Sequence, residues 1–205
     1  MTLRIAAALS LFLGTATLLG YFHVLGKTPW ASAEARHLRA MKDRTTAPRS
    51  PEAVPFAELA RLPRHLPLAE RARLERRGVV VEGYVQRMLR AVDGDLHLDV
   101  TAESPGASGP LQHYAVAEIT PSWRARFGSY DRLVEALRPR IGGAAAWERE
   151  PRRVRLTGWL LYDFPHERRA LRRRYPAALG AWEVHPVTRL EVWDEALGRF
   201  REHTP

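Results

Sequence analysis

The fold of this chain is decided by residues 79–101, VVVEGYVQRMLRAVDGDLHLDVT. The first half is rich in β-branched residues and predicts a strand over 79–89, with Gly83 as a bend or bulge point. Asp93-Gly94 is a hairpin turn signal. Apolar and polar residues then alternate to the end of the stretch, as in a strand that buries one face. The stretch therefore predicts the opening hairpin of a β-domain.

Three further strands and a helix are predicted downstream. Alternating or β-branched runs place the strands at 113–120, 154–162 and 183–193. Between the first two of these, Ser129 is expected to cap a helix over 130–138. Three strands, a helical connection and two more strands follow the order of the OB-fold. We therefore expect a mainly β fold over 79–194: a five-stranded OB-like Greek-key barrel with a helix between strands three and four.

Composition excludes several kinds of chemistry. The 205 residues include no cysteine, which rules out disulfides, cysteine-ligated zinc and thiol catalysis. The formal net charge is +9, but its distribution is uneven. Residues 27–78 carry twice as many basic as acidic side chains, whereas 79–205 is nearly balanced. The basic excess thus lies before the predicted barrel, which weakens a nucleic-acid interpretation of the barrel itself.

The N-terminal segment at 5–26, IAAALSLFLGTATLLGYFHVLG, has no formal charge and is long enough to cross a hydrocarbon core of ~30 Å. It predicts an uncleaved membrane anchor, with a cleaved signal peptide as the alternative. The short N-terminal tail favours export, although Lys27 and the basic residues after it favour a cytoplasmic C-terminal side. We expect a membrane-anchored chain with an extracytoplasmic domain in the periplasm or cell envelope, and keep the cytoplasmic face as the alternative.

Four parts are predicted along the chain. They are an anchor or signal segment at 1–26, a basic, partly helical tether at 27–78, the barrel at 79–194 and a C-terminal tail at 195–205. Within the tether, Pro51 is expected to begin one helix. Gly78 is expected to end another in the left-handed conformation.

Several strings in the predicted strands resemble a family of uncharacterised bacterial OB-fold-like domains that are often exported. They are DLHLDV at 95–100, AEITP at 117–121, VRLTGWLLYD at 154–163 and WEVHPVTRLEVW at 182–193. The last string is the most specific, and the resemblance covers roughly 79–194. It implies an OB-like fold and brings no established activity.

Histidines and carboxylates on the predicted strands are the residues most suggestive of chemistry. They are Asp95, His97, Asp99, His113, Glu118 and His185. Imidazole and carboxylate ligands suit zinc or manganese, but residues two apart on a strand lie ~6–7 Å apart and need neighbouring strands to converge on one ion. We favour solvated strand faces, with a buried His185 that donates to a backbone carbonyl. The alternative is a divalent metal site that includes His97, Asp99 and His185.

Aromatic residues on the last two strands allow two interpretations. Trp159 and Trp182 could stack bases of a single-stranded nucleic acid, or they could fill the barrel and brace its rim. We favour packing because the charge of the predicted barrel is nearly balanced.

The sequence favours a non-enzymatic OB-like binding module that needs no cofactor and is held at a membrane by residues 5–26. Its partner could be a protein, a saccharide or a nucleic acid. Two alternatives stay open: a metal-dependent hydrolase and a single-stranded nucleic-acid-binding domain. The candidate ligand face comprises His97, Asp99, Glu118, Trp159, Trp182 and His185. The hydrolase would use the two histidines and two carboxylates of this set. The sequence has no nucleophile elbow and no phosphate-binding glycine-rich loop.

Overall fold

The computed structural model describes residues 31–104, 112–141, 150–167 and 178–205. The chain divides into two compact units, Met1–Met41 and Lys42–Pro205. Helix α2 (Ala33–Lys42) spans the boundary between them. The predicted membrane segment at 5–26 lies outside the described residues. Among the residues that are described, no helix is both long and apolar enough to cross a bilayer.

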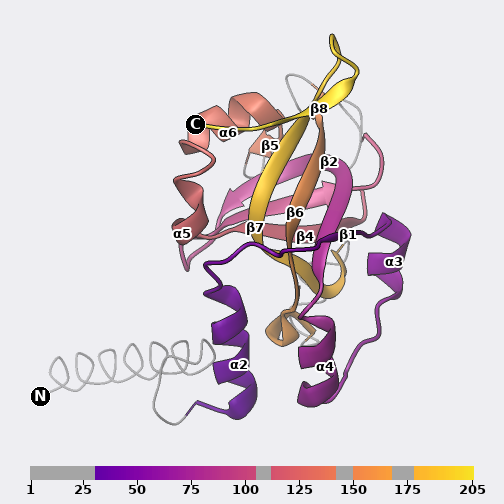
Figure 1. The fold of residues 1–205 in the computed structure, drawn as a ribbon, viewed down its shortest axis with the longest axis vertical. Coiled ribbons are helices and arrows are strands. Elements are labelled where there is room, and N and C mark those ends of the chain that lie inside the picture. The colour runs from indigo at the N-terminus through magenta and orange to yellow at the C-terminus, as the bar shows by residue number, and fades with distance from the viewer. Residues whose placement is uncertain (1–30, 105–111, 142–149, 168–177) are drawn as a thin grey trace, which may run out of the picture. The chain divides into compact units, whose positions relative to one another are not determined.

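The second unit is built around a strand-rich sheet that closes on itself (Figure 1). Its principal strands are β2 (Gly78–Arg90), β3 (Leu96–Thr101), β4 (Tyr114–Ile119), β6 (Arg153–Tyr162) and β7 (Ala178–Asp194). Hydrogen bonds join them in the order β2–β3–β4–β7–β6 and then back to β2, so a ring passes through all five. Within the ring the β4–β7 pair is parallel and the other pairs are antiparallel. These are the five predicted strands, although β7 begins five residues before its predicted start.

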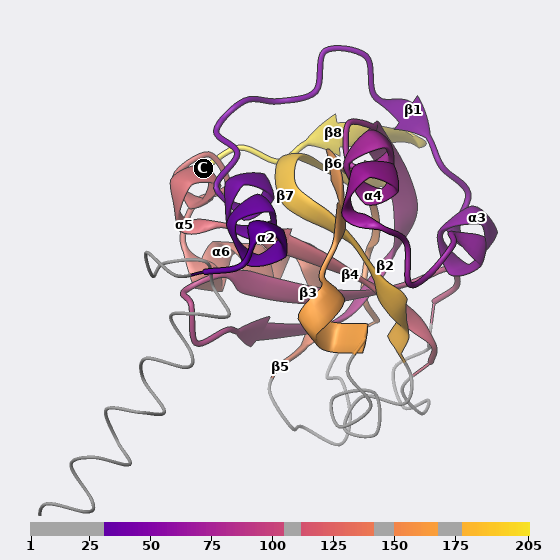
Figure 2. The same ribbon diagram turned by 90° about the horizontal axis from the view of Figure 1, so that it is seen from below.

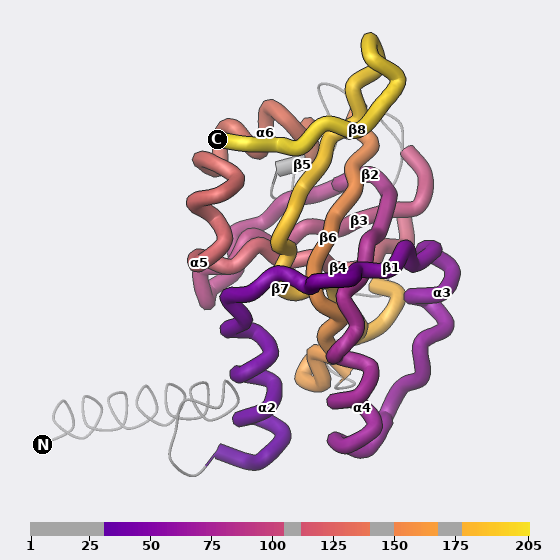
Figure 3. The backbone as a smooth tube through the Cα atoms, viewed as in Figure 1, coloured from indigo at the N-terminus to yellow at the C-terminus, as the bar shows by residue number. Residues whose placement is uncertain are grey.

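Three shorter strands extend this sheet. They are β1 (Glu52–Ala53), β5 (Arg140–Ile141) and β8 (Arg199–Glu202). The first two pair with β2, and β8 pairs antiparallel with β7, beside which the chain returns in Figure 3. The segment predicted as a C-terminal tail at 195–205 therefore includes a paired strand.

Helices make the described structure mixed α/β rather than mainly β. They include α3 (Phe56–Arg61), α4 (Leu68–Leu74), α5 (Pro121–Arg124), α6 (Tyr130–Leu137) and the 3-10 turn η1 (Phe164–Glu167). Helices α5 and α6 fill the predicted connection between the third and fourth ring strands, and Ser129 caps α6 by accepting a hydrogen bond from the Arg132 amide. Figure 2 shows the helices distributed around the strands.

Two expectations about the segment before β2 are wrong. The helix expected at Pro51 begins at Phe56 instead, because Glu52 and Ala53 pair with β2. Gly78 is the first residue of β2 and not a left-handed helix cap. A Cβ atom at Gly78 would lie 2.2 Å from Pro48 Cβ, so glycine is required there for close approach of the preceding segment.

The core lies inside the ring. Leu96, Leu98 and Val100 are buried in it, which confirms the alternation predicted for β3. Val54, Leu59 and Leu62 join the same core, so part of the predicted tether belongs to the folded unit.

Glycines allow the ring strands to approach closely. A Cβ atom at Gly83 would lie 2.4 Å from the Thr101 carbonyl oxygen, and one at Gly158 would lie 2.4 Å from that of Pro186. Real Cβ atoms do not tolerate such contacts, so these positions require glycine. The shift in the β2–β3 register falls between Val85 and Arg87, shortly after the bend point expected at Gly83.

Candidate functional site

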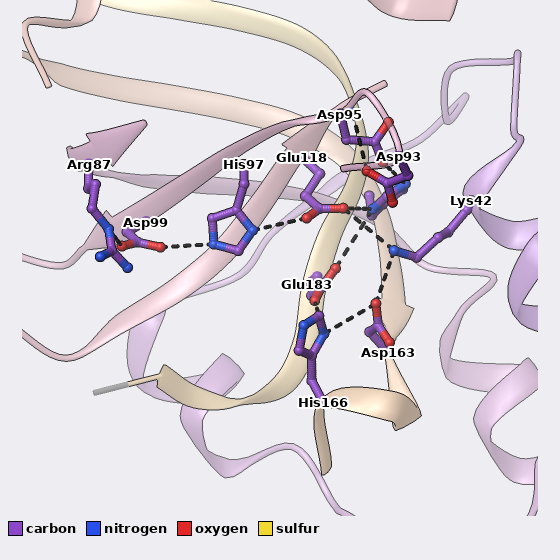
Figure 4. A network of polar contacts seen from close by, with 11 residues as sticks. Lys42, Arg87, Asp93, Asp95, His97, Asp99, Glu118, Asp163, His166 and Glu183 are labelled. Atoms are coloured by element: carbon purple, nitrogen blue, oxygen red, sulfur yellow. Dashed lines mark hydrogen bonds and ion pairs between the residues drawn. The ribbon is translucent and has the colours of Figure 1, made fainter. Parts of the chain in front are cut away.

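Acidic and basic side chains form a network on the side of β3, β4 and β7 that faces away from the core (Figure 4). Its members are Lys42, Arg87, Asp95, His97, Asp99, Glu118, Asp163, His166, Glu183 and His185. All five carboxylates and His185 are buried. The expectation that these strand faces are solvated is therefore wrong.

Strand register brings the network together. His97 on β3 is directly opposite Glu118 on β4. The parallel pairing of Ala117 with Val184 then sets Glu118 beside the outward-facing residues of β7, Glu183 and His185. Arg87 lies on β2 and Asp99 on β3, and Asp95 directly precedes β3. Three members come from segments next to the sheet: Lys42 ends α2, Asp163 follows β6, and His166 lies in η1.

One branch of the network is a line of hydrogen bonds centred on His97. Its Nε2 lies 2.9 Å from Asp99 Oδ1 and its Nδ1 lies 3.0 Å from Glu118 Oε1, while Arg87 donates to the other oxygen of Asp99. Burial alone would lower the pKa of His97, but the hydrogen bonds to the two carboxylates outweigh it and raise the pKa to about 10. Since both ring nitrogens are engaged, His97 supports Glu118 and leaves no nitrogen for an ion.

The other branch is a closed ring in which acids and bases alternate. The successive contacts are Glu118–Lys42 at 3.6 Å, Lys42–Asp163 at 3.0 Å, Asp163–His166 at 3.3 Å, His166–Glu183 at 3.4 Å, Glu183–His185 at 3.7 Å and His185–Glu118 at 2.8 Å. Each distance joins a nitrogen to a carboxylate oxygen. Lys42 and Glu183 thus lie on opposite sides of one compact polar ring.

His185 is surrounded by carboxylates but has no hydrogen bond within the described part of the chain. Its side chain is 0 % exposed, with Glu118 Oε2 2.8 Å from Nδ1 and Asp95 Oδ2 3.7 Å from Nε2. Neither nitrogen meets an acceptor in the direction that a hydrogen bond requires. The expected bond to a backbone carbonyl is absent among the described residues. Four other buried atoms of the network also make no hydrogen bond to a described residue: Glu118 Oε2, Asp163 Oδ1, Glu183 Oε2 and His166 Nδ1.

Two groups of side chains have the geometry of a metal-ligand set. One is Asp95, Glu118 and His185; the other is Asp163, His166 and Glu183. In each group the candidate ligand atoms lie within 4.8 Å of one another. Ligand bonds of ~2.0–2.2 Å to zinc place neighbouring ligand atoms roughly 3 Å apart or slightly more, so small adjustments would close either group around an ion.

The network carries more negative than positive charge unless protons or cations are added. Its five carboxylates face two permanent cations, Lys42 and Arg87. Burial would lower the pKa of Lys42, but Asp163, Glu118 and Glu183 together hold it well above its usual value. The deficit of three positive charges can be met by protonating the histidines or by binding metal ions.

The pKa values of the histidines indicate that bound protons balance the excess negative charge of the network. For His185 burial favours the neutral ring, yet the contacts with Glu118 and Glu183 raise its pKa to about 9. For His166 the carboxylates of Asp163 and Glu183 likewise overcome burial and raise the pKa to about 11. Burial raises the pKa of Asp95 to about 7. Ion-free protein therefore holds protons that an arriving cation would displace.

Other predicted site residues lie elsewhere. Trp182 is buried in the core, where it packs edge-on against Tyr162 and donates to the Pro63 carbonyl. Trp159 is partly exposed, lies under the Arg44 guanidinium and donates to the Thr46 carbonyl. The exposed His113 directly precedes β4 and is not among the residues labelled in Figure 4. The structure thus brings together the histidines and carboxylates but not the tryptophans.

Sequence reasoning missed Lys42, Asp163, His166 and Glu183. Glu183 carried a usable signal, because it stands two residues before His185 on one strand and so shares its face. The other three come from short helical or turn segments, which have no strand periodicity.

Comparisons with family models, curated proteins and solved structures give no match for this chain. The resemblance to bacterial OB-fold-like domains therefore stays a prediction.

Proposed function

We propose that this chain is an OB-like module that holds a divalent cation between Asp95, Glu118 and His185. The observation that carries the proposal is His185, whose two ring nitrogens are fully buried among carboxylates and make no hydrogen bond within the described residues. The carboxylates contact these nitrogens without the direction that a hydrogen bond requires, which leaves the buried polar atoms poorly satisfied. A cation would bind one imidazole nitrogen and the carboxylates at once.

The ligand types favour zinc or manganese. One imidazole nitrogen and carboxylate oxygens suit these ions better than calcium or magnesium, which prefer oxygen alone. Asp95, Glu118 and His185 are all buried, so the ion would have no open side for a substrate. An ion that no substrate can reach would act structurally, which supports a non-enzymatic binding module rather than a hydrolase at this position.

The order of the ring supports an OB-like barrel as the scaffold. Counted along the chain, the ring joins its first, second, third, fifth and fourth strands before returning to the first. The third and fifth strands are parallel, and helices fill the connection between the third and fourth. A five-stranded Greek-key barrel of the OB type places its ligand face on the second and third strands. Here these are β3 and β4, which carry His97 and Glu118.

We also propose that residues 5–26 tether this module to a membrane and that the module lies on the extracytoplasmic side. The support is the uncharged 22-residue stretch, which is long enough to span a hydrocarbon core, and Arg4 on its N-terminal side. Alkaline phosphatase fused after Pro205 is expected to be active in cells, because it requires export. A fusion that is inactive as phosphatase, while green fluorescent protein fused at the same position fluoresces, would place the module in the cytoplasm.

The cation is tested by titrating chelator-treated full-length protein with Zn²⁺ or Mn²⁺ in a calorimeter. Wild-type protein is expected to bind stoichiometrically. Loss of an outer-shell partner typically weakens a metal site ~10–100-fold, so the ligand variant His185→Gln is expected to lose at least about 100-fold in affinity. His65→Asn, a substitution of an exposed histidine outside the network, serves as the matched control and should bind like wild type.

Circular dichroism would establish that His185→Gln folds before its affinity is compared. Absence of saturable binding to wild type would contradict the proposal. Equal affinity of folded His185→Gln and wild type would also contradict it.

A further inference from the structure

We infer that Asp163, His166 and Glu183 form a second divalent-cation site, and that Glu183 is also a ligand of the first ion beside Asp95, Glu118 and His185, so that the two ions lie as a pair. The inference rests on the proposed function, since it extends the same network. His166 Nδ1 lies 3.3 Å from Asp163 Oδ2 and 3.4 Å from Glu183 Oε1. These separations are typical of atoms that bind one ion.

An independent observation also points to a ligand at this second group. Asp163 and Glu183 are buried, yet Asp163 Oδ1 and Glu183 Oε2 make no hydrogen bond to any described residue, and neither does His166 Nδ1. Buried carboxylate oxygens normally have partners. An ion would supply one after a small rotation of each carboxylate, because Asp163 Oδ2 and Glu183 Oε1 are the oxygens that face His166.

Glu183 links the two sites. Its Oε1 is close to His166, whereas its Oε2 lies 3.7 Å from His185 Nδ1 in the first site. A carboxylate that offers one oxygen to each ion holds them a few ångströms apart, comparable to the ~3.5–4 Å of two-metal centres. Lys42 spans the same two groups through Glu118 and Asp163, so its charge acts on both.

Exposure distinguishes the sites. The His166 side chain is 38 % exposed, whereas the His185 side chain is 0 % exposed. An ion at the second site would bind the buried Nδ1 of His166 but would lie beneath a ring that is itself partly exposed. It is expected to exchange faster than the first ion and to be removed first by a chelator.

The experiment counts ions on the full chain and measures whether they interact. Chelator-treated protein in detergent is loaded with Mn²⁺, analysed for bound metal and examined by electron paramagnetic resonance. Wild type is expected to hold two Mn²⁺ with a spin-coupled spectrum and to release them to a chelator in two phases. His166→Ala should retain one ion with an uncoupled spectrum.

A variant of Glu183 tests whether this residue binds both ions. Glu183→Gln is expected to weaken both ions, whereas Glu191→Gln should leave both unchanged. Glu191 is a suitable control because it is a buried glutamate on the same strand whose partners, Arg155 and Arg189, lie outside the network.

The outcomes separate this inference from the proposed function. One bound ion, lost in His185→Gln and kept in His166→Ala, would overturn the second site while the first stands. Two ions without spin coupling would overturn the sharing of Glu183. No bound ion would refute both proposals.

Discussion

Replacing Glu118 by glutamine is expected to lower the free energy of unfolding of the ion-free protein by about 3–5 kcal/mol, the usual cost of removing one partner from a buried ion pair. Glu118 is buried and contacts Lys42, His97 and His185. Burial would raise the pKa of Glu118, but the nearby Lys42 charge and the two histidines hold it well below the usual value. Glutamine has nearly the same shape as glutamate, so the loss of unfolding free energy would come from the missing charge and not from a cavity.

The matched control is Glu82→Gln. Glu82 also has two basic partners, Arg153 and Arg155, at 2.6 and 2.7 Å. Its side chain is 34 % exposed, however, and exposed pairs contribute about 1 kcal/mol or less. Urea unfolding in the presence of a chelator measures both variants. Similar losses in the two variants would contradict a central role for Glu118 in the network.

The strands of this fold were predictable because periodicity is a local property. Alternation in β3 puts Leu96 and Leu98 on one face, and the core confirms that assignment. Strands β1 and β5 have two residues each, too few to display a period. They exist because β2 offers them an edge to pair with, which is a tertiary property.

The site was predictable in its residue types but not in its burial. Alternation places His97 and Asp99 on the face opposite the core, yet it cannot reveal whether other segments cover that face. The favoured expectation of solvated strands therefore failed. Lys42, Asp163 and His166 complete the network from segments without strand periodicity, and tertiary contacts bring them to Glu118 and Glu183.

The stability of the ion-free protein is expected to fall as the pH rises from about 6.5 to about 10. His97 and His185 have folded-state pKa values of about 10 and about 9, raised from the ordinary 6.5 by their carboxylate partners. A group whose pKa is higher in the folded state stabilises fully below the unfolded value and loses that contribution as the pH passes the folded value. Each pKa unit corresponds to about 1.4 kcal/mol, so the fall should be readily measured.

At acid pH the dependence is opposite: stability falls as the pH falls. Lys42 keeps the pKa values of Glu118 and Asp163 below their ordinary ones despite burial, so the stability that they contribute is lost as the pH falls below about 4. Asp95 acts in the opposite direction between these limits: its pKa is raised to about 7, so its contribution to stability falls as the pH rises from about 4 to about 7.

A bound cation should oppose the alkaline loss, because the ion replaces the protons that His185 would otherwise release. Urea unfolding with chelator and with Mn²⁺, at pH values through the alkaline window, tests both statements. The difference between the two profiles is expected to widen with pH, since protons compete less with the ion. A chelator profile that stays flat from pH ~6.5 to ~10 would show that the histidines are not held protonated by their carboxylates. A constant difference between the profiles would show that ion and protons do not compete for the same atoms.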